Sequence, residues 1–155
     1  MSLTVKPPNT IYLGGGDGPG GESGCTVENR YPCTGTPLPG MLAETYNNGG
    51  KVYYRPHATA DGVVQTAVFL EQLVWNLGVD DRYAANDLAM VGILRSGSSF
   101  WGLIASGQNI APAAILQSAG DGTLKALASG QGRFKALESS GGAVTTLTRI
   151  RVEVI

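Results

Sequence analysis

Few residues in this chain have side chains suited to catalysis. The single histidine, His57, follows Pro56, and a Ser-His-Asp hydrolase would have to use it as its general base. The serine-rich run at residues 96–99 lacks the Gly-x-Ser-x-Gly frame that presents a nucleophilic serine on a sharp turn. We therefore expect His57 to be structural or solvated, and we predict that the chain has no catalytic residue and is not an enzyme.

The acidic residues and the glycine-rich run form no ligand motif. Asp80 and Asp81 are adjacent, so on an extended chain their side chains point to opposite sides and make a poor acid–base pair. A solvated turn explains them better. The glycines at 14–21 are not followed by the Gly-Lys-Ser/Thr of a phosphate-binding loop. We expect no cofactor.

The two cysteines, Cys25 and Cys33, lie close together in a stretch rich in glycine and proline. Their spacing permits a disulfide-closed loop, but one pair does not make a disulfide scaffold. Two interpretations stay open, free thiols in a cytosolic product or a disulfide formed after release into an oxidising medium. Because no second cysteine pair or nearby histidine completes a zinc site, we expect no bound metal.

Composition limits the classes of partner. The chain has 155 residues and a net charge of −1, and only 15% of its residues are charged, against about 25% in typical domains. This balance gives no basic footprint for nucleic acid or for an anionic membrane surface. No apolar run reaches the roughly 18 residues of a membrane-spanning helix, and the first residues lack the apolar stretch of a secretion signal. Neither nucleic acid nor a membrane is expected as a partner.

Residues 1–40 differ in composition from the rest. Six glycines occur in the eight positions from 14 to 21, and further glycines and prolines follow up to Gly40. Glycine carries a large backbone entropy cost and proline removes a hydrogen-bond donor, so no helix is expected there. We predict a long loop or extended arm at residues 1–40 that contacts neighbouring subunits, and a single β domain at 41–155.

The pattern from Met41 onward is typical of short strands separated by turns. We expect strands at 51–55, 63–71, 88–94 and 100–105, with one helical turn as an alternative at 72–76. A hairpin is indicated at 115–118 and 123–126, around Asp121-Gly122. From Val144 to Val154 the even positions are β-branched, while Arg149, Arg151 and Glu153 alternate with them, which predicts a strand with one packed and one wet face. The fold class predicted is all-β with little helix, an antiparallel sandwich or barrel.

The order of these segments resembles the head decoration, or cement, proteins of tailed bacteriophages. The segments that carry the resemblance are Gly40–Glu44, His57–Gly62, Ala67–Glu71, Val79–Asp87, Leu103–Ile110, Leu116–Leu124 and Arg149–Ile155. They consist of turns and strand patterns and include no catalytic signature. One departure is Asn86, where family members usually carry glycine, and asparagine is the next best residue at positive φ. Residues 14–39 look like an insertion.

The resemblance implies a structural protein of the virion. It would be made in the bacterial host cytoplasm, bind the outer capsid surface at symmetry axes and clamp neighbouring major capsid subunits against genome pressure. Its partners would be the phage major capsid protein and copies of itself. By analogy with other decoration proteins a homotrimer is favoured, and a homodimer is the alternative.

Two other classes of function remain in view. A carbohydrate- or receptor-binding β-module displayed on a virion would expose a cluster of aromatic residues beside polar groups. Its candidates are Trp75, Trp101, Tyr53, Tyr54 and Tyr83, although such residues are more often core and interface anchors. A small hydrolase would need His57 in a cleft next to a serine or an aspartate.

Overall fold

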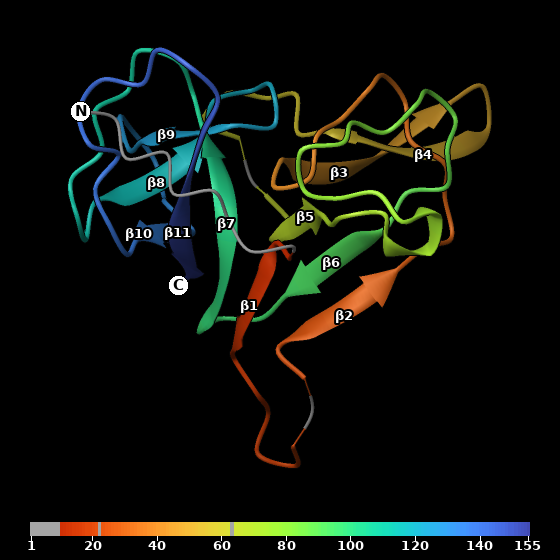
Figure 1. The fold of residues 1–155 in the computed structure, drawn as a ribbon, viewed down its shortest axis with the longest axis horizontal. Coiled ribbons are helices and arrows are strands. Elements are labelled where there is room, and N and C mark those ends of the chain that lie inside the picture. The colour runs from red at the N-terminus through yellow and green to blue at the C-terminus, as the bar shows by residue number, and fades with distance from the viewer. Residues whose placement is uncertain (1–9, 22, 63) are drawn as a thin grey trace.

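The computed structural model describes residues 10–21, 23–62 and 64–155. About 40% of the chain is strand and 2% is helix, so the all-β prediction is confirmed. Within the described residues the helix consists of one 3₁₀ turn, η1 (Leu73–Trp75), one of the two alternatives for residues 72–76. The strands form a closed barrel and a second sheet that packs beside it (Figure 1).

Five strands close the barrel. They are β7 (Ser98–Ile104), β11 (Thr148–Val154), β10 (Phe134–Ala136), β8 (Ile115–Ser118) and β9 (Leu124–Ala126), hydrogen-bonded in that order. All of these pairs are antiparallel, and the barrel closes through a parallel pairing of β9 with β7. The edge strand β1 (Tyr12–Gly15) pairs with the first part of β7.

Large side chains pack against one another inside the barrel. Phe100 and Phe134 meet edge to face, with ring centroids 5.8 Å apart. Gly102 faces Leu124 and Phe100, because a Cβ built on this glycine would be 2.7 Å from Leu124 Cδ1 and 3.1 Å from Phe100 Cε2. The glycine therefore makes the tight packing of the barrel interior possible.

The second sheet is antiparallel and also has five strands. Its order is β2 (Cys25–Glu28), β6 (Val91–Leu94), β5 (Ala67–Phe69), β3 (Leu42–Asn48) and β4 (Lys51–Pro56). Leu42, Val68 and Leu94 share one hydrophobic core with the barrel. A second cluster, which includes Phe69 and Tyr83, lies elsewhere in this half of the molecule. The sheet thus serves two cores, which explains why β5 is buried throughout and β6 at three of its four residues.

The described part of residues 1–40 contains two strands besides the expected loop. β1 pairs with β7 and β2 pairs with β6, so this region supplies an edge strand to each sheet. Ile11 and Leu38 are buried in the same domain. Residues 1–9 lie outside the described residues. Glycine permits close backbone approach at the base of the β1–β2 connection, because a Cβ on Gly24 would lie 1.9 Å from the Gly15 carbonyl oxygen.

Other sequence predictions are confirmed with different limits. The hairpin of β8 and β9 forms as expected, with Ser118 opposite Leu124. The strand expected at 63–71 is regular only over Ala67–Phe69, since Thr66 has a φ of 49° that interrupts it. The C-terminal strand begins at Thr148 and not at Val144. Its supposed wet face is wrong at Arg149, which is buried.

Candidate functional site

His57 is buried, and the fold places it beside a serine. Its Nδ1 lies 2.7 Å from Ser118 Oγ on β8, and its Nε2 lies 3.7 Å from Glu44 Oε2 on β3. The sequence could not indicate this trio, because its members are far apart in the chain and belong to both sheets. Ser-His-Glu is a set of residue types that some hydrolases use, so its geometry needs a test.

The geometry gives Ser118 no access to a substrate. Ser118 and His57 are each only 1% exposed. Ser118 Oγ also accepts a hydrogen bond from the backbone N–H of Gly120, at 3.1 Å. Glu44 Oε1 already accepts hydrogen bonds from Arg55 Nε and from the backbone N–H of Ala58. A nucleophile must reach a carbonyl carbon, and this hydroxyl is enclosed by its own chain.

The trio instead joins the barrel to the second sheet. The His57 backbone N–H donates to the Leu42 carbonyl, and the His57 carbonyl accepts from Gly122 N–H in the β8–β9 turn. Leu42 N–H in turn donates to the Gly122 carbonyl, so two of these three backbone bonds connect the two halves. The hydrogen bond between the His57 and Ser118 side chains adds to this junction and satisfies polar groups that water cannot reach.

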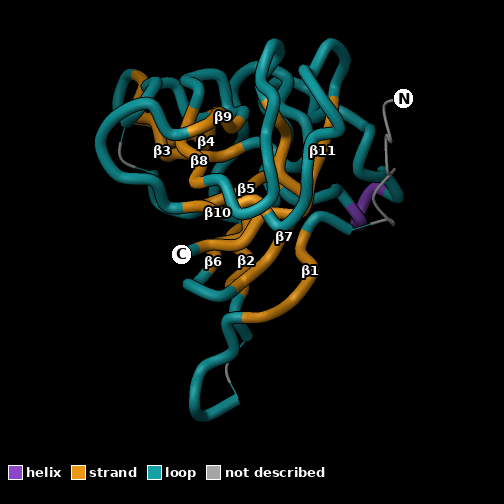
Figure 2. The backbone as a smooth tube through the Cα atoms, turned by 90° about the vertical axis from the view of Figure 1, so that its left-hand side faces the viewer, coloured by secondary structure: helices purple, strands orange, loops and turns teal. Residues whose placement is uncertain are grey.

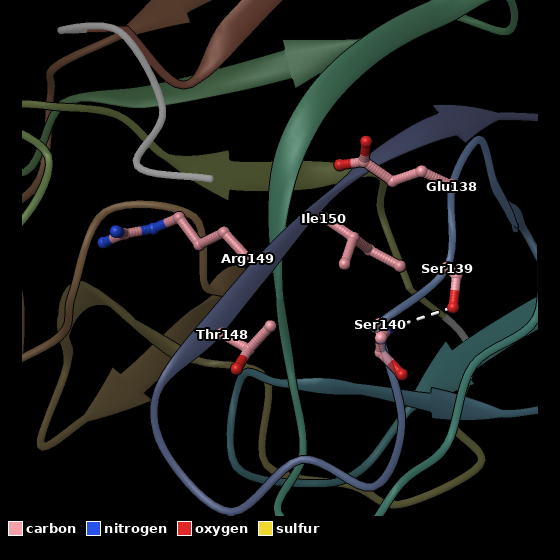
Figure 3. Close-up of a pocket in the computed structure, with 7 residues that line it drawn as sticks. Glu138, Ser139, Ser140, Thr148, Arg149 and Ile150 are labelled. Atoms are coloured by element: carbon pink, nitrogen blue, oxygen red, sulfur yellow. Dashed lines mark hydrogen bonds between the residues drawn. The ribbon is translucent and has the colours of Figure 1, made fainter. Parts of the chain in front are cut away.

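A hollow of about 230 Å³ lies beside the C-terminal strand (Figure 3). Its walls include the hydroxyls of Ser139, Ser140 and Thr148. Each is used locally: Ser139 accepts from Gly141 N–H, and Ser140 and Thr148 donate to backbone carbonyls. Figure 3 shows the Arg149 side chain turned away from the serines. The hollow therefore presents no group that lacks a partner and could select a ligand.

Arg149 points instead toward the loops that lead into and out of the second sheet. Its guanidinium donates to the carbonyls of Pro39 and Val79 and pairs with Asp80 at 2.7 Å. Asp80 and Asp81 do lie in a turn, where Asp81 accepts a 2.6 Å hydrogen bond from Gly78 N–H. The ion pair of Asp80 was not foreseen, because the partner is 69 residues away.

The aromatic candidates for a sugar platform do not gather in one exposed cluster. Trp101, Tyr54 and Tyr83 are buried. Tyr53 is partly covered, with the Lys51 ammonium 5.3 Å from its ring centroid. Trp75 is 66% exposed, and it belongs to a different feature of the surface.

That feature is the apolar turn, defined as Leu73–Trp75. These three residues are 62%, 76% and 66% exposed, the highest values among the large hydrophobic residues described. The turn is held by backbone bonds from Trp75 and Leu77 N–H to the Gln72 carbonyl, and it ends at Asn76 in the left-handed conformation. Three successive apolar side chains thus project from a fixed loop and remain mostly exposed. Figure 2 shows the turn on the side of the molecule that carries β1.

A groove of about 270 Å³ adjoins the apolar turn and is mostly apolar. We call it the edge groove, because β1 and β2, the edge strands of the two sheets, supply much of its wall. Its lining residues are Thr10, Tyr12, Ser23, Cys25, Val27, Leu70, Glu71, Leu73 and Met90. Val27 is 52% exposed, so the face of β2 is uncovered there.

Glu71 is the acidic residue of the edge groove. It is only 6% exposed, and its Oε2 accepts a 2.9 Å hydrogen bond from the Ile11 backbone N–H. Among the described residues no lysine, arginine or histidine forms an ion pair with it. A nearly buried carboxylate normally has a cationic partner or several hydrogen-bond donors. Sequence reasoning missed Glu71, which resembled an ordinary polar residue at a strand end.

Both cysteines are free thiols in this structure. Cys25 lines the edge groove, where burial, with a contribution from Glu71, raises the pKa of its thiol. Cys33 is fully buried, and its Sγ donates to the Ala84 carbonyl. Burial, and then the nearby Asp87, raises the pKa of Cys33 as well. Thiols with raised pKa values are weak nucleophiles at neutral pH.

No protein-family model and no curated protein matches this chain. The described residues contain no cluster of three or more His, Cys, Asp or Glu side chains able to hold a metal ion. No helix in the described part of the chain is long and apolar enough to cross a membrane.

Proposed function

We propose that this chain is a structural protein of a bacteriophage virion that binds the outer capsid surface and stabilises contacts between major capsid subunits. The proposal rests on the order of segments that resembles head decoration proteins. The observation that carries it is the apolar turn, whose three side chains are each more than 60% exposed. Exposed apolar side chains grouped on a rigid loop are typical of protein–protein contact sites.

The fold suits a mechanical role. The two sheets share a core, and the five strands of the barrel form a closed ring of paired strands. Clamping capsid subunits requires packed area and rigidity and no reacting group, which agrees with the enclosed state of His57 and Ser118. Each small contact would be repeated at every equivalent position of a symmetric shell, so the summed effect would be large.

Sedimentation with capsids tests the proposal. Purified protein is mixed with capsids of its own phage that lack this protein, and the amount that pellets is measured. We expect saturable binding. A variant with Leu73→Ser, Val74→Ser and Trp75→Ser should lose at least tenfold in affinity, since each buried apolar side chain contributes about 1.5–3 kcal/mol. A matched control changes Leu127 and Leu147, exposed apolar residues outside the turn, to serine.

The outcomes separate the proposal from its alternatives. Failure of the wild-type protein to pellet with capsids would overturn it. Equal binding by the triple-serine variant would exclude the apolar turn as the contact surface. The competing β-module, for which Trp75 beside Asn76 is the best candidate contact, predicts binding to immobilised glycans and none to capsids. Sedimentation equilibrium of the free protein would decide between a trimer, a dimer and a monomer.

A further inference from the structure

The edge groove combines three features that suit one kind of ligand. It has apolar walls, it contains a nearly buried carboxylate with no cationic partner among the described residues, and it borders a free strand edge. From these features we infer that the edge groove binds an extended segment of a partner protein, which pairs with β2 and inserts a lysine or arginine side chain toward Glu71. The chemistry of the groove stands alone, whereas the identity of the partner as a capsid protein rests on the proposed function.

The carboxylate is the first argument. Glu71 is only 6% exposed, and among the described residues its carboxylate has one hydrogen bond, from Ile11 N–H. Transfer of a carboxylate out of water is costly unless a cation or several donors replace the lost water. A lysine or arginine has a long apolar stem that would pack against Leu70, Leu73 and Val27 while its charged head reaches Glu71. A neutral apolar ligand would leave the carboxylate more deeply buried and still unpaired.

The strand edge is the second argument. β2 pairs with β6 on one side only, and the backbone of Thr26–Glu28 makes no other hydrogen bond to described residues. An unpaired strand edge is a template for an added strand. Directly opposite residues on neighbouring strands share a face and have Cβ atoms about 4.5–5.5 Å apart. A residue added opposite Val27 therefore points into the same groove as Val27 does.

The third argument is the position of the apolar turn. Leu73 belongs both to the turn and to the wall of the edge groove. A segment in the groove would therefore be continuous with contacts on Val74 and Trp75. The apolar turn would supply contact area. The groove would fix the orientation of the bound segment and select a positively charged side chain in it.

A peptide titration tests the inference on the isolated protein. The probe is acetyl-Ser-Val-Lys-Val-Ser-amide, and the matched control peptide carries norleucine in place of lysine. Binding is followed by two-dimensional ¹H–¹⁵N NMR, with shift changes expected at Thr26, Val27 and Leu73. We expect the lysine peptide to bind about tenfold more tightly than the norleucine peptide, the size of effect typical of a charged hydrogen bond.

Two variants locate the effect. Glu71→Gln keeps an oxygen acceptor for Ile11 N–H and removes the charge, so the preference for lysine should disappear. Glu153→Gln, a partly exposed carboxylate on the barrel paired with Lys135, is the matched control and should change nothing. If Glu71→Gln fails to fold, Val27→Lys serves instead, because an ammonium supplied by the chain itself would compete with the peptide and weaken its binding at least tenfold.

Equal affinity for the two peptides, an unchanged preference in Glu71→Gln, or shift changes confined to other surfaces would each overturn the inference. The capsid experiment gives an independent answer. Capsid binding without any peptide binding overturns the groove inference and leaves the proposed function standing. Peptide binding without capsid binding supports the groove inference and overturns the proposed function.

Discussion

Tyr83 shows how one side chain can join distant parts of a β fold. It is buried, and its hydroxyl donates to the Leu70 carbonyl at 2.6 Å while accepting from Met90 N–H at 3.2 Å. These two residues flank the paired strands β5 and β6. Burial raises the pKa of Tyr83 well above the ordinary tyrosine range. The sequence named Tyr83 only as a candidate for a sugar platform or a core anchor, because the carbonyl it binds is defined by the tertiary fold.

Replacement of this hydroxyl should give a pH-dependent loss of stability. Tyr83→Phe leaves the Leu70 carbonyl and the Met90 N–H without their partner, which should cost about 1–3 kcal/mol at pH 7. Above about pH 10 the tyrosine of the unfolded chain ionises while the folded one stays protonated. The wild-type protein therefore loses stability as pH rises, and the variant lacks this contribution.

The difference in unfolding free energy between Tyr83→Phe and wild type should thus shrink between pH 8 and pH 11. Urea titrations of both proteins at several pH values measure this difference. The contributions of the other titrating groups cancel in the difference, because both proteins carry those groups. A difference that stays constant over this range would contradict the assigned cause.

At the scale of elements, local signals explain which strands could be predicted. The hairpin of β8 and β9 was predicted because Asp121-Gly122 lies between two short apolar runs, and Gly122 does have a positive φ, of 85°. The strand β11 was predicted from its β-branched alternation. Both signals reside within a few residues, so sequence alone was sufficient.

β1 and β2 were missed for the opposite reason. β1 contains two glycines and β2 directly follows Gly24, and their pairing partners, β7 and β6, lie more than 60 residues away. Propensity counts glycine against a strand, whereas here Gly15 takes a φ of 87° and allows close backbone packing, since a Cβ there would lie 2.4 Å from the Gly97 carbonyl oxygen. The edge groove depends on these two strands, so it could not be predicted either.

The buried Arg149 of β11 gives a second prediction, about how neighbouring elements are held together. The Arg149 guanidinium joins the barrel to the carbonyls of Pro39 and Val79, and its side chain is 5% exposed, whereas that of Asp80 is 48% exposed. Arg149→Ala should destabilise the protein by about 2–6 kcal/mol, because it leaves two buried carbonyls without donors, at about 1–3 kcal/mol each. Asp80→Asn should cost less than about 1 kcal/mol, because solvent screens the exposed carboxylate.

Thermal and urea unfolding of the two variants give the comparison. The ranking is the critical result: if Asp80→Asn proves as damaging as Arg149→Ala, the ion pair and not the pair of carbonyls holds these elements together.

At the scale of the whole molecule, the barrel and the second sheet are one structural unit. Trp101 of β7 and Leu42 of β3 lie in the same hydrophobic core. Backbone bonds around His57 and Gly122 and the contacts of Arg149 join the halves at further points. The predicted division between residues 1–40 and 41–155 does not follow this architecture, because the edge strands of both sheets come from the first segment.

A shared core predicts that the two halves unfold together. Separation of the barrel from the sheet would expose Trp101, Leu42 and Val68 at once, so neither half is expected to persist alone.

Because Trp75 is exposed and Trp101 is buried, a Trp75→Phe variant makes Trp101 the sole tryptophan and a reporter of that shared core. Its fluorescence and the far-UV circular dichroism of both halves should give the same urea midpoint and the same slope. Unmodified protein, whose second tryptophan adds a signal from the apolar turn, is the control for any effect of the substitution. If fluorescence changes at a lower urea concentration than circular dichroism, the interface opens before the sheets melt, and the chain consists of two folding units rather than one.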